Sequence, residues 1–159
     1  MPDPAAVSTL RAVLRAEIEG HRALIRVLYH ETEALRTADP EAVAVAASAK
    51  LRHVSELEAL ARQRTELLIS LGVTITSAGV DTAGLQPLVA AELRNDWTAL
   101  RAVAAEAQQT NALNGRLIAR HQRHCEAALG ALLQARPNPV YGADGRPRHD
   151  APARAIAAI

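Results

Sequence analysis

The residues best suited to chemistry are three side chains near the C-terminal end of the chain. His121, His124 and Cys125 are spaced so that one face of a helix would carry all three, and imidazole and thiolate groups are zinc ligands. No fourth ligand follows at a matching spacing, although Glu126 is near. Such a run on a helix is more often ordinary packing, so we expect neither a metal site nor a cofactor.

A second candidate is a carboxylate-bridged metal site of the kind found in helical bundles, suggested by Glu17, His21 and Glu31. Such sites place a glutamate three residues before a histidine. None of the six histidines has a glutamate at that distance. The sequence also contains no phosphate-binding glycine loop and no serine nucleophile elbow. We therefore expect a binding protein rather than an enzyme.

The composition favours helices that pack side by side. Apolar residues make up 49% of the 159 residues, alanine and leucine dominate, and phenylalanine is absent. Alanine and leucine are strong helix formers. The formal net charge of +1 creates no field that would attract nucleic acid or a membrane. Arginines are concentrated after residue 116, but that region lacks the stacking aromatics of a nucleic-acid surface, so we expect no nucleic-acid partner.

The cysteine count and the N-terminus bear on the compartment. Cys125 is the single cysteine, which excludes an internal disulfide and suits a reducing compartment. The N-terminus lacks the basic start and apolar stretch of a signal peptide, and no apolar run approaches the roughly 20 residues of a membrane span. We expect a cytoplasmic protein without membrane insertion.

Long helices must position any functional side chain. Pro4 follows Asp3, and Pro40 follows Asp39. Both pairs are typical helix starts, because aspartate caps the helix and proline fits its first position. The short connection before Pro40 makes the first two helices antiparallel neighbours.

The apolar periodicity predicts an all-α fold of three antiparallel helices packed as a coiled-coil-like bundle, the third helix being the longest. The apolar seam of the second helix is expected to include Leu51 and Val54. Residues 72–86 have no sustained period and predict a loop. One helical domain would cover residues 1–136, with helices at about 4–37, 41–71 and 87–136.

The third predicted helix carries the most regular pattern. From Leu93 to Leu132, alternating steps of four and three residues meet no charged side chain, which is typical of a coiled-coil seam. Asn111 and Asn114 are predicted to lie on this seam. Buried asparagine in such a position fixes the register of the helices at a cost in stability. A polar notch for a partner helix is the alternative interpretation.

The length of the third helix indicates that its C-terminal end has no neighbouring helix. At 1.5 Å per residue it would be roughly 70–75 Å long, against roughly 50 Å for the first two helices. If it starts beside the end of the second helix, its residues from about 121 to 136 project beyond the pair. An apolar stripe without an internal partner marks an interaction site or an oligomer contact. Burial of Leu129 and Leu132 against the first two helices would exclude this hypothesis.

The region after residue 136 is rich in proline, glycine and arginine, and it predicts a flexible tail over residues 137–159. Within it, the segment Tyr141-Gly142-Ala143-Asp144-Gly145 is turn-prone. Tyr141 is either a chance aromatic in a linker or a docking residue that buries a large area.

The run Asn111-Ala-Leu-Asn-Gly-Arg-Leu-Ile118, followed further on by Tyr141-Gly-Ala-Asp-Gly145, resembles the FlgN family of flagellar export chaperones. The resemblance covers most of the chain, from about residue 5 to 146. It implies a non-enzymatic, cytoplasmic chaperone of type III secretion. Members bind the C-terminal helices of the hook–filament junction proteins FlgK and FlgL, prevent their premature assembly, and deliver them to the export gate, whose FlhA component recognises the loaded chaperone.

By this resemblance the end of the third helix binds cargo, and Tyr141 with Gly142 contacts the gate. The apolar face and the matching region together give the expected cargo contacts: Asn111, Asn114, Leu117, Ile118, His121, Cys125, Leu129, Leu132 and Leu133. The alanine-rich end, residues 151–159, departs from the family pattern, and one interpretation is an autoinhibitory helix over the cargo groove. The alternative function is that of a homodimeric coiled-coil structural or regulatory protein. We expect a monomer or a weak homodimer.

Overall fold

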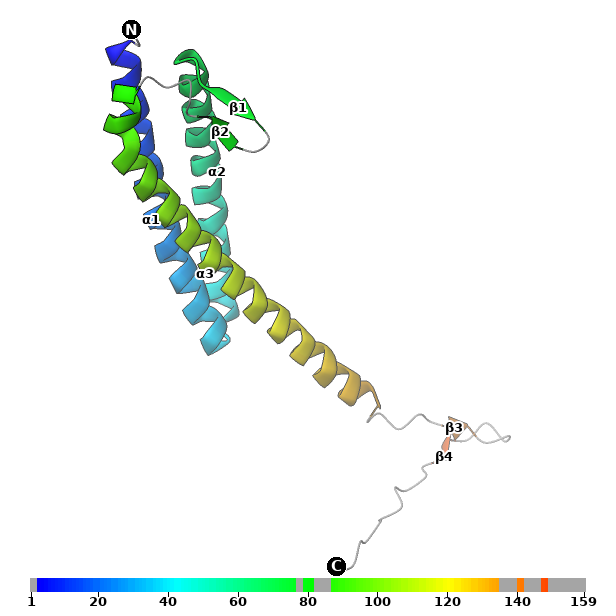
Figure 1. Cartoon of the computed structure of the whole chain (residues 1–159). Helices are drawn as coiled ribbons and strands as arrows, with labels where there is room; N and C mark the ends of the chain where they lie inside the picture. Colours follow the sequence, from blue (N-terminus) through cyan, green and yellow to red (C-terminus); the bar gives the residue numbers. More distant parts are fainter. Residues whose placement is uncertain (1–2, 77–78, 82–86, 135–139, 142–146, 149–159) are drawn as a thin grey trace, which may run out of the picture. The chain divides into compact units, whose positions relative to one another are not determined.

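The computed structural model describes residues 3–76, 79–81, 87–134, 140–141 and 147–148. Most of these residues belong to three helices, which confirms the predicted all-α fold of packed helices (Figure 1). The bounds lie within two residues of the predicted ones: α1 is Pro4–Thr37, α2 is Pro40–Ser70 and α3 is Pro87–Gln134.

Aspartate caps begin the first two helices as predicted. Asp39 Oδ1 accepts hydrogen bonds from the backbone N–H groups of Glu41 and Ala42, at 3.1 and 3.0 Å. Asp3 caps α1 in the same way through Ala5, at 3.0 Å. Ala38 closes the turn between the helices in the left-handed conformation, with φ at 54°. The capped, tight turn makes α1 and α2 antiparallel neighbours.

The third helix runs in the same direction as α1. Asp96, early in α3, lies 3.9 Å from Arg11 and 3.6 Å from Arg15. Further along both helices, Asn114 contacts Leu28. Two clusters of buried residues fill the contacts: Val7, Leu10, Leu14, Ile18, Leu68, Val73, Leu93 and Leu100 form one, and Leu24, Ile25, Leu28, Leu57 and Ala107 form the other.

The segment after α2 contains a small hairpin, so the prediction of a loop over residues 72–86 is wrong where the two short strands lie. Strand β1 (Thr74–Thr76) pairs antiparallel with β2 (Gly79–Asp81). The β-branched residues of β1 favour extended backbone. Strands of three residues are too short to show a period of two, which is why the pattern did not reveal them. Residues 77–78 and 82–86 lie outside the described residues.

The chain forms two compact units, residues 1–119 and 120–159, with the boundary inside α3. In the second unit, residues 120–134 are helical, and strand β3 (Val140–Tyr141) pairs antiparallel with β4 (Pro147–Arg148). The predicted turn between them, including Gly142, lies outside the described residues, as does the alanine-rich end. None of the helices that the structure describes is both long enough and apolar enough to cross a membrane.

Candidate partner-binding site

The first part of α3 places a buried residue at every seventh position. Leu93, Leu100, Ala107 and Asn114 are all 5% exposed or less. Between the last two, the buried residue is Thr110 at 8%, whereas Asn111 is exposed. The prediction that Asn111 lies on the seam is therefore wrong. The Thr110 hydroxyl donates to the Glu106 carbonyl at 3.0 Å, so threonine can be buried there without a further partner.

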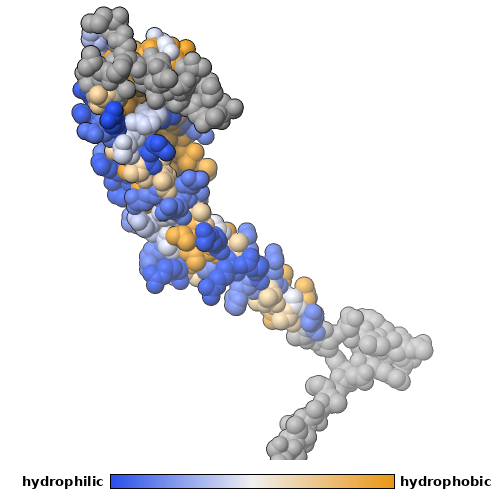
Figure 2. Space-filling view, viewed as in Figure 1, coloured by the Kyte–Doolittle hydropathy of each residue, from blue (hydrophilic) through white to orange (hydrophobic). Residues whose placement is uncertain are grey.

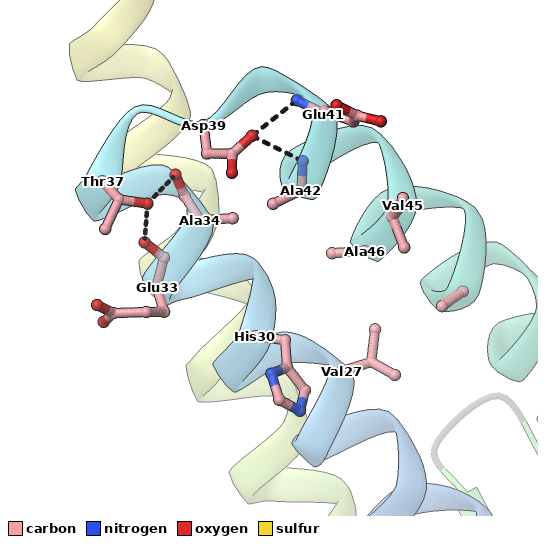
Figure 3. A pocket seen from close by; sticks show the side chains of 11 residues that line it. Val27, His30, Glu33, Ala34, Thr37, Asp39, Glu41, Ala42, Val45 and Ala46 are labelled. Atoms are coloured by element: carbon pink, nitrogen blue, oxygen red, sulfur yellow. Dashed lines mark hydrogen bonds between the residues drawn. The ribbon is translucent and has the colours of Figure 1, made fainter.

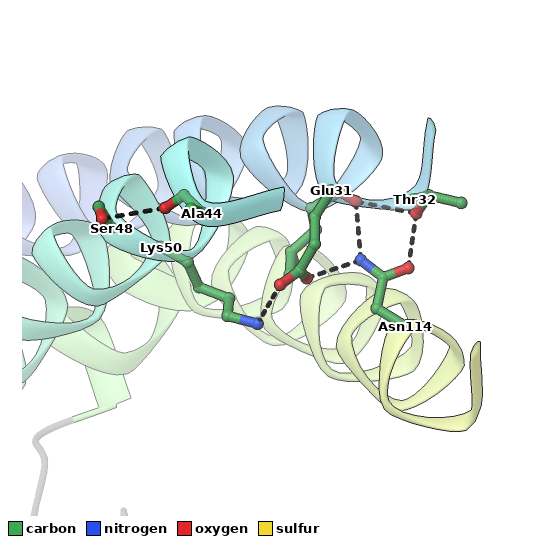
Figure 4. A network of polar contacts seen from close by, with 7 residues as sticks. Glu31, Thr32, Ala44, Ser48, Lys50 and Asn114 are labelled. Atoms are coloured by element: carbon green, nitrogen blue, oxygen red, sulfur yellow. Dashed lines mark hydrogen bonds and ion pairs between the residues drawn. The ribbon is translucent and has the colours of Figure 1, made fainter. Parts of the chain in front are cut away.

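Asn114 is fully buried and finds its hydrogen-bond partners on α1 (Figure 4). Its Nδ2 donates to the Leu28 carbonyl and to Glu31 Oε2, both at 2.8 Å. Its Oδ1 accepts from the Thr32 hydroxyl at 2.6 Å. The oxygen and the nitrogen of the Asn114 side-chain amide thus both find partners on α1. These hydrogen bonds fix the register of α3 on α1. A Cβ at Gly115, beside Asn114, would meet open space rather than a neighbouring side chain or another helix.

Two buried ion pairs, two heptads apart, connect α1 to α2. Glu31 Oε1 accepts from Lys50 Nζ at 2.6 Å, and Glu17 Oε2 accepts from Arg64 at 3.0 Å. The carboxylate side chains are only 2% and 3% exposed. The third helix completes each layer: Asn114 bonds Glu31, and the Trp97 ring lies 5.5 Å from the Arg64 guanidinium. Charge layers of this kind specify which turns of the helices face one another.

The Glu17 layer is less completely satisfied than the Glu31 layer. His21 Nδ1 and Arg64 Nε are buried without a hydrogen-bond partner among the described residues. Burial raises the pKa of Glu17, against the opposing effect of the Arg64 charge. Burial, and then the Arg64 charge, lower the pKa of His21. This layer therefore holds polar groups at a cost in free energy.

These ion pairs explain an error in the predicted seam of α2. Lys50 and Arg64 occupy inward positions, whereas Leu51 is 70% exposed and Val54 is 38% exposed. The long stems of lysine and arginine can cover apolar surface while their charged ends reach a buried carboxylate. The sequence of α1 could have revealed these pairs, because Glu17 and Glu31 occupy heptad positions where apolar residues are expected and therefore need a cation from another helix.

Among the hollows on the surface of the described helices, two involve more than one helix. One has a volume of about 460 Å³ and is lined by all three helices: Glu17, His21, Leu24, Val54, Leu57, Glu58, Ala61, Arg64, Trp97, Leu100, Arg101 and Ala104. The other, of about 640 Å³, lies between α1 and α2 near their connection (Figure 3). Its apolar lining is mostly alanine and valine, with Glu33, Asp39 and Glu41 among its polar residues.

The predicted cargo contacts divide into three groups by exposure. Asn114 is buried, and Leu117, Ile118 and His121 are half-buried. The exposed members are Asn111, Cys125, Leu129, Leu132 and Leu133, of which the three leucines are 61%, 67% and 60% exposed. The expected exposure of Leu129 and Leu132 is thus confirmed, and hydrophobic surface is visible on the last described turns of α3 (Figure 2).

The remaining candidates in this region are the metal cluster and Tyr141. His124 is exposed, and no group of three histidine, cysteine or acidic side chains in the described ranges is placed to hold a metal ion. Tyr141 lies in β3, where it pairs with Pro147.

The described helices thus enclose two polar layers, and the last turns of the longest helix, α3, leave three leucines exposed on the surface. The model of the FlgN protein family matches residues 1–149. The chain therefore belongs to the FlgN family, and its role is that of a flagellar export chaperone that binds flagellar export substrates. No curated protein and no solved structure matches the chain.

Proposed function

We propose that this protein binds the C-terminal helices of the junction proteins FlgK and FlgL through the last turns of α3, in the cytoplasm. It keeps them from assembling prematurely and delivers them to the FlhA component of the type III export gate. It acts by binding and has no catalytic activity. The observation that carries the proposal is the exposure of Leu129, Leu132 and Leu133, each at 60% or more.

Helical spacing places these side chains on one face. Cys125, Leu129 and Leu132 stand four and then three residues apart, the spacing by which one helix presents anchors to another. Arg120 and Arg123, both exposed, fall on the opposite face. Full burial of each leucine against a cargo helix would stabilise the complex by about 1.5–3 kcal/mol. A coiled-coil-like pairing with an amphipathic helix is the mode of binding that this face favours.

Exposure refines the roles of the predicted contacts. Because Asn114 has no exposed surface and bonds α1, it holds α3 in place rather than touching cargo. Asn111 is exposed and is available to a polar group of the cargo. The half-buried Leu117, Ile118 and His121 would extend the apolar contact toward it.

The proposed gate contact is Tyr141, together with Gly142. It is supported by the likeness of the tail segment to the family pattern and by the place of Tyr141 in a short paired strand. A tyrosine can bury much area at a small entropic cost, which suits a docking contact.

Calorimetry with C-terminal peptides of FlgK and FlgL tests the cargo surface. The double substitution Leu129→Asp with Leu132→Asp should abolish binding, because it introduces charge where an apolar contact forms. Tyr141→Ala should leave peptide affinity unchanged and weaken binding to FlhA. Val45→Asp is a matched control, since Val45 is also exposed, at 67%, but lies on α2. Unchanged peptide affinity in the leucine variant rejects the assignment.

The exposed leucines also favour a second candidate function, that of a homodimeric structural or regulatory protein. A second copy could cover the same face. Light scattering distinguishes the chaperone from the homodimer. A tight dimer that dissociates on the Leu129→Asp with Leu132→Asp substitution would bury this face and leave no free surface for cargo. We expect a monomer or a weak homodimer.

A further inference from the structure

A groove between α2 and α3 presents apolar side chains from all three helices. Leu24 of α1 lines it together with Leu57 of α2 and with Trp97 and Leu100 of α3. Val54 also lines it and is 38% exposed, so the groove can be reached from solvent. In a four-helix bundle, a fourth helix packs against two neighbouring helices and covers such a core face. Leu24, Leu57 and Leu100 are buried and form its floor, so Val54 and the half-buried Trp97 are the apolar side chains that a further helix could cover.

The two walls of this groove carry opposite charges. Glu58 on α2 and Arg101 on α3 both line the hollow and are both exposed. Among the residues that the structure describes, neither forms an ion pair. Glu17 and Arg64, by contrast, neutralise one another at 3.0 Å. An occupant that complements the groove therefore brings a cation to the α2 wall and an anion to the α3 wall.

We propose that this groove docks one amphipathic helix of another protein, whose apolar face covers Val54 and Trp97, with a lysine or arginine toward Glu58 and a carboxylate toward Arg101. The site lies within residues 1–119 and is separate from the exposed leucines of residues 120–134, so it does not depend on the proposed function. Because reversing a helix exchanges its flanks, the two wall charges also select the direction in which it lies.

A synthetic probe tests the groove in the full chain. The probe is a helix of about five turns, with alanine and leucine on one face, lysine along one flank and glutamate along the other. Its fluorescence anisotropy on titration with the protein should show saturable binding. Val54→Asp should weaken that binding by about tenfold or more, as truncation of a central apolar contact does. Val45→Asp, also on α2 but outside this groove, should leave it unchanged.

Charge exchange tests the pairing of the walls. Glu58→Lys and Arg101→Glu should each weaken binding of the probe by about three- to tenfold, because each creates a like-charge contact. The double variant should recover the original affinity, since the probe can then bind in the reverse direction. Damage to the fold would not be repaired by the second substitution, so recovery reports on charge pairing alone.

Four outcomes overturn the proposal. The probe fails to saturate, or the double variant fails to recover affinity. In the third, binding survives Val54→Asp but is lost on Leu129→Asp with Leu132→Asp, which places the probe on the other surface. Self-association that Val54→Asp abolishes would identify a second copy as the occupant and would also overturn it. The leucine variant leaves the groove intact, so failure here is distinguishable from failure of the cargo surface.

Discussion

Between Leu93 and Asn114, α3 has a buried residue at every seventh position, whereas none of its residues from Arg120 to Gln134 is buried. Both stretches carry the same recurrence of uncharged residues. They differ in what covers them, because α1 and its hydrogen-bonding groups complement the first stretch. A heptad pattern therefore predicts which face of a helix is apolar, and the partner decides whether that face stabilises the fold or remains available for binding.

The largest expected difference is between matched leucines of the two stretches. Leu100→Ala removes a side chain that is 5% exposed and leaves a cavity, so it should lower the free energy of unfolding by about 3 kcal/mol. Leu132→Ala, at 67% exposed, should change it by less than about 0.5 kcal/mol. Urea denaturation measures both, and equal losses would show that the two stretches do not differ.

The two asparagines should differ next. Asn114→Ala removes three buried hydrogen bonds and leaves Glu31 Oε2 without its amide donor, although Glu31 Oε1 keeps Lys50. It should cost about 2 kcal/mol in the free energy of unfolding. Asn111→Ala, at an exposed position, should have an effect within about 0.5 kcal/mol. A large loss in the Asn111 variant would contradict the register described for α3.

Substituting two helical glycines should change the stability less, and in opposite directions. A Cβ at Gly115 meets nothing within 4 Å, so Gly115→Ala should stabilise the protein by about 0.5–1 kcal/mol. At Gly20 a Cβ would lie 2.8 Å from Leu57 Cδ2, so Gly20→Ala should destabilise the packing of α1 on α2. Thermal unfolding followed by circular dichroism compares the two, and a stabilised Gly20 variant would contradict that close approach.

The smallest expected effect is on how the stability changes as the pH falls. Because the folded-state pKa of His21 is lowered, neutral His21 stabilises the fold above its ordinary pKa of 6.5, and this contribution is lost as the pH falls through the folded value. The raised pKa of Glu17 acts in the opposite sense: its contribution is present below 4.5 and is lost as the pH rises through the folded value.

His21→Gln should therefore lose less stability than the natural protein between neutral pH and about pH 5. Urea midpoints at several pH values measure the slope, with His30→Gln as the control because His30 is exposed. Parallel slopes for the His21 variant and the natural protein would show that His21 is not responsible for the acid sensitivity.

Local signals predicted the helices well. Asp3 and Asp39 each cap the helix that begins at the following proline, as predicted, because capping depends only on neighbouring residues. The hairpin after α2 was missed since three-residue strands carry no period. The exposure of Leu129 and Leu132 followed from a difference in helix length, which is also readable along the chain.

The periodicity of one helix does not reveal its register against the neighbouring helices. Leu51 and Lys50 are adjacent, and the choice of which one faces inward depends on Glu31 of another helix. In the same way, Asn111 and Asn114 look equivalent along the sequence, and the carbonyl of Leu28 and the carboxylate of Glu31 distinguish them. Pairing of buried polar groups across helices is thus the information that periodicity lacks.

Trp97 has a consequence for optical measurements. It is the only tryptophan of the chain, it lines the groove between α2 and α3, and its ring lies beside Arg64. Emission excited selectively from tryptophan therefore originates at one wall of one groove. A shift of that emission on adding a second protein would report a change in the polarity around this ring, without any label.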